Sequence, residues 1–214
     1  MKTAEQIAAW ADKLRDISAM GLQFATSPYE RDQLRQVQDI ALEMFALASG
    51  QPLSDWEPLR APALSRPTPF AAGDAAVIDE AGRILLIKRA DNGKWAMPGG
   101  FLEVGETSAE GVVREAREET GVICRPVAVV GVFDSRLCGT SSLHHIYHLL
   151  FLCEPVEDLG RNGATHAHEV LDTGWFHQDE LPEGIDPGHV GRIPEAFRVW
   201  RREGGAFFDG FHDA

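Results

Sequence analysis

Apolar residues recur at three- and four-residue steps in two stretches at the start of the chain, and this pattern predicts two amphipathic helices. The first covers residues 3–20 and is expected to stop at Gly21. The second begins at Ser27, which has the capping-box spacing with Glu30, and stops at Gly50. A hairpin of about 50 residues buries only a marginal core by itself. We therefore expect it to pack on the rest of the chain or on a second subunit.

The pattern changes after this hairpin. Residues 51–69 carry five of the chain's twelve prolines, which predicts an extended linker. Beyond the linker, short apolar runs bounded by turn residues predict strands, with two helical patterns among them. The strands are expected at residues 75–78, 83–89, 123–133, 145–153 and 170–176, and the helices at 108–120 and 191–202. The first two strands flank a tight turn and predict a β-hairpin.

This order of elements predicts three parts: a helical hairpin at residues 1–50, a proline-rich linker at 51–69, and an α/β domain with a mixed sheet at 70–214. Apolar residues make up 44% and charged residues 25% of the 214 residues, as in ordinary globular proteins. No apolar run approaches the length of a membrane span, and the N-terminus lacks a signal-peptide core.

Cysteine and charge content narrow the expected setting. Three cysteines without a CxxC pair fit a reducing compartment, so we expect a cytoplasmic protein. Lys and Arg number 20 against 33 Asp and Glu, and the resulting net charge of −13 disfavours long nucleic acids as partners. The first 50 residues are also net acidic, so a packing or dimerisation role suits the hairpin better than DNA binding.

Three carboxylates share one face of the helix predicted at residues 108–120. Glu115, Glu118 and Glu119 are three and four residues apart, and Gly121 has the place of a C-terminal cap. Carboxylates held this close repel one another unless a cation lies among them. Their hard oxygens suit Mg²⁺ or Mn²⁺, and Mg²⁺ usually completes its shell with waters and substrate phosphates. A solvated acidic helix face is the simpler alternative.

Other residues around this helix favour the metal site. Arg114 on the helix and Glu106 on the preceding loop are expected to pair and to tie the loop to the helix. Gly99 and Gly100 allow positive φ angles, which would turn a backbone carbonyl toward the metal. An acidic surface face alone explains neither this pair nor the two glycines.

The segment resembles the Nudix box, whose pattern is G-x5-E-x7-R-E-U-x-E-E-x-G-U with U apolar. Every fixed position is matched from Gly100 to Val122. The helical hairpin, the linker and the segments 95–100, 133–136 and 169–182 are similar to one Nudix subgroup, which hydrolyses nucleoside diphosphates linked to a second group. The resemblance implies an α/β/α sandwich with a mixed sheet, preceded by a small N-terminal helical hairpin.

The resemblance also implies roles for individual residues. The metal ligands would be the carboxylates of Glu115 and Glu119 with the backbone carbonyl of Gly99. Glu118 would be a third ligand or would hold a metal-bound catalytic water. Structural roles within the box would fall to Gly100, Glu106, Arg114 and Gly121. The general base of Nudix enzymes varies and often lies outside the box, and Glu169, just before a late strand, has such a position; an exposed loop glutamate is the alternative.

Two arginines and five histidines are further candidates for the site. The guanidinium groups of Arg89 and Arg136 suit phosphate oxygens, although surface ion pairs would also explain them. Five histidines lie close together in the sequence without the spacing of a zinc site, and we expect them on the surface or in a substrate pocket. They are His144, His145, His148, His166 and His168.

Together with the acidic helix face, the resemblance implies a Mg²⁺- or Mn²⁺-dependent hydrolase that cleaves a nucleoside diphosphate-linked small molecule by attack of water, as a homodimer. ADP-ribose and CDP-choline are substrates in the subgroup. ADP-ribose-preferring relatives often carry a proline after the box, and residues 127–153 contain none. Pyrophosphate removal from RNA 5′ ends is a second possibility. A nucleotide sensor without catalysis is the third, although all the box carboxylates are present.

Overall fold

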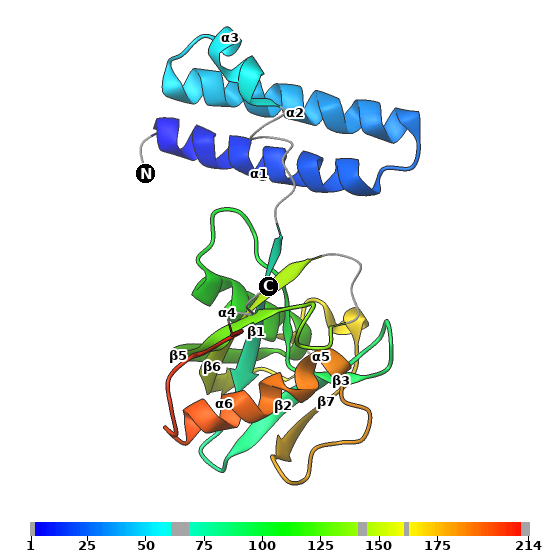
Figure 1. Cartoon of the computed structure of the whole chain (residues 1–214), viewed down its shortest axis with the longest axis vertical. Coiled ribbons are helices and arrows are strands. Elements are labelled where there is room, and N and C mark those ends of the chain that lie inside the picture. The colour runs from blue at the N-terminus through cyan, green and yellow to red at the C-terminus, as the bar shows by residue number, and fades with distance from the viewer. Residues whose placement is uncertain (1–2, 61–68, 141–144, 161–162, 211–214) are drawn as a thin grey trace. The chain divides into compact units, whose positions relative to one another are not determined.

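Two long helices open the chain in the computed structural model, which describes residues 3–60, 69–140, 145–160 and 163–210 (Figure 1). They are α1 (Thr3–Phe24) and α2 (Pro28–Ser49). Ser27 and Glu30 form the expected capping box, and Gly50 ends α2 in the left-handed region at φ 69°. Together with a short α3 these helices form one compact unit, and the strands with α4, α5 and α6 form a second.

The sequence pattern predicted that α1 would end at Gly21, but the helix continues to Phe24. A Cβ atom at Gly21 would lie 2.7 Å from a side-chain carbon of Leu34 on α2, so the glycine allows the two helices to approach closely. The apolar stripe of α1 also divides: Ala11 is fully buried, whereas Trp10 remains more than half exposed.

The proline-rich stretch is not extended throughout, in contrast to the expectation for residues 51–69. Leu53–Trp56 forms α3, and a 3₁₀ turn follows at Glu57–Leu59. The ring of Trp56 stacks on Phe45 of α2 with centroids 5.1 Å apart, and its Nε1 donates to the Ser49 hydroxyl at 3.2 Å. This aromatic contact stabilises the packing of the segment against α2.

The second unit contains a mixed sheet of five strands in the order β4-β1-β6-β5-β8 and an antiparallel sheet in the order β3-β2-β7. The strands are β1 (Phe70–Val77), β2 (Arg83–Arg89), β3 (Trp95–Ala96), β4 (Gly99–Phe101), β5 (Val122–Asp134), β6 (Ile146–Asp158), β7 (Val170–His177) and β8 (Phe207–Phe208). The helices are α4 (Ser108–Thr120), α5 (Pro187–Val190) and α6 (Arg192–Trp200), with a 3₁₀ turn at Ala167–Glu169. Every strand and helix expected beyond the linker is present, with ends moved by a few residues.

The expected hairpin between the first two of these strands is the exception. The turn forms, since the Asp79 N–H donates to the Arg83 carbonyl at 3.0 Å. The strands then diverge into different sheets after a single bridge between Ile78 and Ile84. Most of β1 is buried, and it pairs with β4 on one side and β6 on the other. A strand with partners on both sides has no free edge left for β2.

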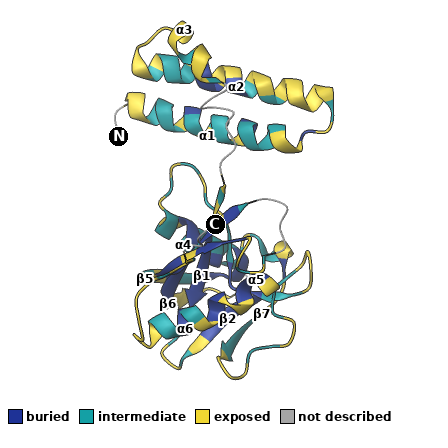
Figure 2. Ribbon diagram, in the orientation of Figure 1, coloured by how far each residue is buried: buried dark blue, intermediate teal, exposed yellow. Residues whose placement is uncertain are grey.

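Helices cover both faces of the central strands, as expected for an α/β/α sandwich. Ala76 and Ile78 pack in one cluster with Phe197 of α6. The alternate residue Val77 packs in a second cluster with Val112 of α4. Figure 2 shows the buried strands between these helices. The packing fixes α4, and with it the acidic face, against the sheet. Within the described part of the chain, no helix is long and apolar enough to cross a membrane.

Candidate active site

Helix α4 has defined ends. The hydroxyl of Thr107 and the carboxylate of Glu110 form a capping box at its start. Gly121 ends it with φ 79°, and a Cβ atom there would lie 2.1 Å from the carbonyl oxygen of Gly160. Only glycine therefore fits at this end of the helix. The carboxylates of Glu115, Glu118 and Glu119 lie in its last two turns, close to this fixed end.

The two glycines of the preceding loop act through close contact rather than through positive φ angles, which corrects the sequence-based expectation. Neither Gly99 nor Gly100 has a positive φ; both lie in β4. A Cβ atom at Gly99 would be 2.4 Å from the carbonyl oxygen of Gly73, and one at Gly100 would be 2.8 Å from the carboxyl of Glu115. The glycines thus allow β4 to lie against β1 and beneath the Glu115 carboxylate.

Glu119 is buried and meets this loop. Its Oε2 accepts a hydrogen bond from the Gly99 N–H at 2.9 Å. The N–H and C=O of one strand residue point to the same side, so the Gly99 carbonyl is also directed away from β1. Burial raises the pKa of Glu119 to about 8, and the charges of Glu115 and Glu169 add to this rise. The Gly99 bond and the positive charge of Arg89 oppose it.

Arg114 connects the loop with the acidic face. It makes two bonds to Glu106, from Nε at 3.0 Å and from Nη2 at 2.8 Å. Its Nη1 donates to Glu115 at 2.7 Å and to Glu118 at 3.2 Å. Even so, burial raises the pKa of Glu115, against the lowering effect of Arg114. One guanidinium is shared among three carboxylates, which leaves excess negative charge.

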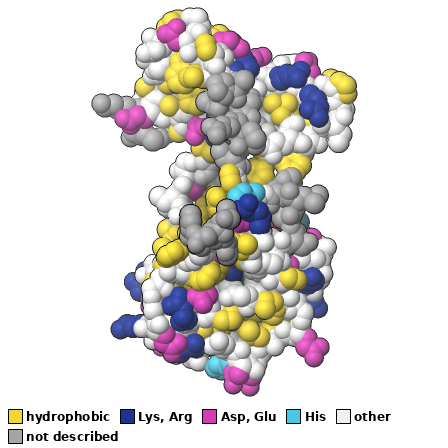
Figure 3. All heavy atoms as spheres, viewed as in Figure 1, with side chains coloured by type: hydrophobic (Ala, Val, Ile, Leu, Met, Phe, Trp, Pro, Cys, Tyr) yellow, Lys and Arg dark blue, Asp and Glu magenta, His cyan; other side chains and the backbone are white. Residues whose placement is uncertain are grey.

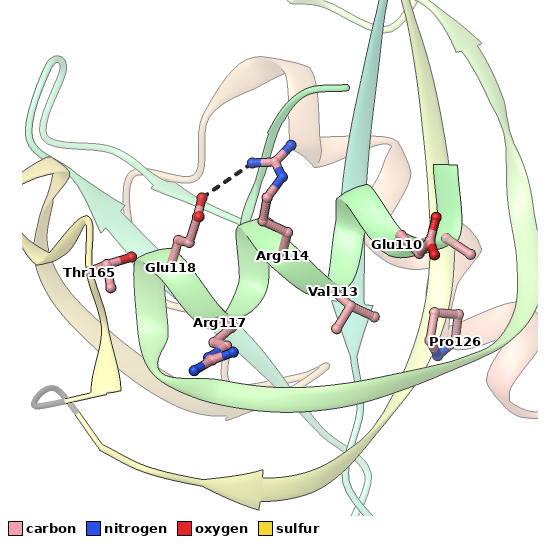
Figure 4. Close-up of a pocket in the computed structure, with 8 residues that line it drawn as sticks. Glu110, Val113, Arg114, Arg117, Glu118, Pro126 and Thr165 are labelled. Carbon is pink, nitrogen blue, oxygen red and sulfur yellow. Dashed lines mark hydrogen bonds and ion pairs between the residues drawn. The ribbon is translucent and has the colours of Figure 1, made fainter. Parts of the chain in front are cut away.

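A pocket of about 580 Å³ lies beside α4 (Figure 4). It shares Arg114 and Glu118 with the acidic face. Its lining residues are Ala109, Glu110, Val113, Arg114, Arg117, Glu118, Pro126 and Thr165. Glu119 and Gly99 are not among them, so the pocket adjoins the acidic face through Arg114 and Glu118. Behind Glu118, the N–H of His166 donates to the Glu118 carbonyl at 2.7 Å, and its Nδ1 lies 3.4 Å from the carboxylate.

Glu169 ends the 3₁₀ turn before β7 and lies close enough for its charge to raise the pKa of Glu119. Its carbonyl accepts the N–H of Ala90 at 2.8 Å, which fixes the turn beside the end of β2. Its side chain is exposed and lies 3.5 Å from Nε2 of His168. The structure therefore brings Glu169 into the neighbourhood of the box carboxylates with its own carboxylate accessible.

The two candidate phosphate-binding arginines have different positions. Arg89 makes two bonds to Asp91, at 3.0 and 2.7 Å, and its charge reaches Glu119. Arg136 lies just beyond β5, a strand of 13 residues that begins next to the C-terminus of α4. There it pairs with Asp134 at 2.5 Å, and its side chain is 66% exposed. The charge of Arg89 acts on Glu119, whereas Arg136 is paired with Asp134, and its contact with a substrate phosphate stays a prediction.

A buried polar group behind β4 was not predicted from the sequence. Asp74, His148, His189 and Arg192 are all at least nine-tenths buried. The histidines were expected at the surface or in a substrate pocket, and His148 is instead in the interior, while His144 lies outside the described residues. A signal was present in the sequence, since Asp74 interrupts an otherwise apolar strand.

The donor set fits a divalent metal. Glu115 and Glu119 are crowded carboxylates, both with raised pKa, and a bound cation would relieve their repulsion. Among the described residues no three His, Cys, Asp or Glu side chains already converge as a cage. Mg²⁺ does not require such a cage, since it usually takes one or two carboxylates and completes its shell with waters and phosphates.

Comparisons with known proteins agree with this geometry. Residues 68–196 match the NUDIX domain family, and residues 5–59 match the family described as the UDP-X-like, N-terminal oligomerisation domain. YjhB of Bacillus subtilis is 30% identical over 173 residues, which cover 80% of this chain and 81% of YjhB. An ADP-ribose pyrophosphatase of Methanocaldococcus jannaschii is 50% identical over 110 residues, covering 50% of this chain and 62% of that protein.

A solved structure shows the same fold over nearly the whole chain. The crystal structure of UDP-X diphosphatase matches with a TM-score of 0.61 and 23% identity, covering 98% of this chain and 100% of that one. The matched domain spans β1 to β7, α4 and the acidic face described above. The chain therefore belongs to the Nudix family of hydrolases, with the N-terminal domain of the UDP-X-like group.

Proposed function

We propose that the protein hydrolyses the pyrophosphate bond of a nucleoside diphosphate linked to a second group, with the aid of Mg²⁺ or Mn²⁺. The observation that carries this proposal is the buried carboxylate of Glu119 bonded to the Gly99 N–H, with Glu115 and Glu169 as neighbouring negative charges. A divalent cation and an anionic pyrophosphate together complement this arrangement.

In this proposal Glu115, Glu119 and the Gly99 carbonyl hold the metal, and Glu118 is a further ligand or holds a metal-bound water. The metal would neutralise phosphate charge and acidify the attacking water. Arg114 and Glu106 keep the loop and the helix in register through their paired bonds.

The base and the phosphate contact are assigned outside the box. Glu169 takes the proton of the attacking water, because its carboxylate is exposed and close to Glu119. The positive charge of Arg89 lowers the pKa of Glu119, so Arg89 lies close to the site. Its guanidinium could release Asp91 and bind a substrate phosphate instead. Arg136 is a second candidate phosphate contact, because its guanidinium is exposed and could release Asp134 to bind a phosphate.

The relatives guide the choice of substrate class. One is named for ADP-ribose and another for UDP-linked compounds, so we propose a nucleoside diphosphate-X of the ADP-ribose or CDP-choline type. Figure 3 shows Lys and Arg side chains scattered among acidic ones on the visible face of the second unit. This mixture and the net charge of −13 favour a small molecule over long RNA.

We also propose a cytoplasmic homodimer formed through the N-terminal unit. Trp10, Ile17 and Phe24 are spaced seven residues apart on α1, and their exposed fractions are 53%, 60% and 50%. Such a stripe of exposed apolar side chains is typical of a helix that pairs with another. Apolar side chains are also visible on the face of this unit in Figure 3. The three cysteines are free, which supports a reducing compartment.

The three proposed parts are residues 1–50, the linker 51–69 and the catalytic domain 70–214. The function is tested by incubating the purified chain with ADP-ribose, CDP-choline and UDP-linked sugars, in Mg²⁺, in Mn²⁺ and after chelation. Release of two monophosphates that depends on the metal supports the proposal. Absence of release from every compound, or full turnover after chelation, contradicts it.

A further inference from the structure

A buried ion pair lies behind the strand that carries Gly99, and the proposed reaction uses neither partner. Asp74 lies on β1, and Arg192 begins α6; both are buried. Nη1 of Arg192 and Nδ1 of His148 contact the same carboxylate oxygen of Asp74, the latter at 3.2 Å. Desolvation of a buried pair offsets much of its attraction, so stability alone does not explain why it is there.

Arg192 belongs to a series of three residues at the start of α5 and α6. They are spaced three apart: Asp186 is the N-cap of α5, His189 lies within α5, and Arg192 is the first residue of α6. The backbone N–H of Asp186 donates to the carbonyl of Trp95 at 2.8 Å. Nδ1 of His189 accepts the N–H of Met97 at 3.2 Å. Two members of the series therefore hold alternate residues of the segment that leads into β4.

Arg192, the third member, acts through Asp74 on Gly99, which is the next alternate residue after Met97. Arg192 holds Asp74, and Asp74 faces Gly99 in the ladder between β1 and β4. A Cβ atom at Gly99 would be 2.8 Å from Cα and 3.0 Å from Oδ1 of Asp74. The Gly99 backbone is thus in direct contact with Asp74. The bonds from Arg192 and His148 fix the position of Asp74.

His189 has the protonation state that its contact requires. Burial and the charge of Arg192 lower its pKa to about 3, so the ring is neutral. A neutral ring with its proton on Nε2 leaves Nδ1 free to accept the Met97 N–H. The hydrogen bond from Met97 to His189 is buried.

We propose that Asp186, His189 and Arg192 form a positioning clamp that holds the backbone of residues 95–99, so that Gly99 meets Glu119 in the geometry needed for metal binding. The clamp residues touch neither substrate nor metal. This inference rests on the proposed function, which assigns Gly99 and Glu119 to the metal.

Two substitutions at one position test the clamp. His189→Leu fills the same space but removes the acceptor for Met97. His189→Asn keeps an acceptor atom close to the position of Nδ1. For both variants we would measure thermal unfolding, hydrogen exchange over residues 95–101, Mn²⁺ affinity of the substrate-free protein, and kcat and KM.

We expect His189→Leu to speed hydrogen exchange over residues 95–101, to weaken Mn²⁺ binding about 10-fold and to lower kcat more than it changes KM. His189→Asn should restore most of each loss. A folded His189→Leu protein with wild-type Mn²⁺ affinity and kcat would overturn the clamp. So would an Asn variant as impaired as the Leu variant, because a structural role of the ring would then suffice.

Arg192→Lys replaces His189→Leu if that variant does not fold. It keeps a positive charge beside Asp74 and loses the bond from Nε to the Gly188 carbonyl. The same measurements apply, with the same direction of change expected and wild-type values contradicting the clamp. A wild-type protein that neither binds Mn²⁺ nor hydrolyses any compound would overturn the proposed function itself. A wild type that does both, with variants that match it, would overturn the clamp alone.

Discussion

The carboxylate of Glu119 and the backbone N–H of Gly99 are 2.9 Å apart, although 20 residues separate them in the chain. This bond joins the end of helix α4 to the edge strand β4 and brings a buried carboxylate beside a carbonyl that points away from β1. The bond joins these two segments into one site, whereas the sequence alone only suggests that they meet.

Gly100→Ala should damage this site without a change of charge. The added Cβ would lie 2.8 Å from the Glu115 carboxyl, so β4 or Glu115 must move. We expect turnover to fall at least 10-fold, the size of effect typical of displaced groups around a metal. Gly205→Ala is the control, since no atom lies within 4 Å of a Cβ there. Equal losses in the two variants would show that the contact with Glu115 is unimportant.

The metal-free protein should lose stability as pH rises, because of Glu119. Its pKa is about 8 in the folded state and near 4.5 in the unfolded chain. Between these values the native protein keeps a proton that the unfolded chain has released. The stabilisation from this group is therefore fully present below about pH 4.5 and is lost as pH approaches about 8.

Denaturant unfolding of the chelated wild type and of Glu119→Gln measures this effect. The wild type should become less stable relative to the variant between about pH 5 and pH 8. A saturating divalent metal should reduce the pH dependence, because it keeps Glu119 ionised. Parallel stability curves for the two proteins would show that burial does not raise the pKa of Glu119.

Glu169→Gln tests the base. If Glu169 takes a proton from water, kcat should fall by about 10²–10⁴-fold with little change in KM and in Mn²⁺ affinity. Weaker Mn²⁺ binding would make Glu169 a ligand. Unchanged kcat would exclude Glu169 and direct the search to the carboxylates at the end of β6, namely Glu154, Glu157 and Asp158.

Ile17→Glu tests the dimer. The side chain is exposed in the single chain, so the substitution should leave the fold intact and place a charge in the stripe formed with Trp10 and Phe24. We expect the molar mass from light scattering to fall from that of a dimer to that of a monomer. Gln23→Glu adds a charge on another side of α1 and should leave the mass unchanged. A monomeric wild type, or an Ile17→Glu dimer, contradicts this assignment.

The box and its helix were predictable because their signals are local. The limits of α4 follow from capping chemistry, and the shared face of the three glutamates follows from helical spacing. The divergence of β1 and β2 was not predictable from a local turn, since it depends on which strands compete for β1. The same holds for Asp74 and Arg192, which are 118 residues apart in the chain. Gly99 and Gly100 are a third case. Their residue type indicated that the loop belongs to the site, but close packing, and not a positive φ, explains why glycine is needed there.

The most direct test is Mn²⁺ binding and hydrolysis by Glu119→Gln, compared with Glu110→Gln on the same helix. Gln at position 110 preserves the capping box, so that variant removes one charge without touching the site. We expect Glu119→Gln to remain folded, to bind Mn²⁺ more weakly and to lose at least about 10²-fold in kcat, with Glu110→Gln close to wild type. Wild-type metal affinity and turnover in a folded Glu119→Gln protein would contradict a metal-dependent hydrolase centred on Glu119 and Gly99.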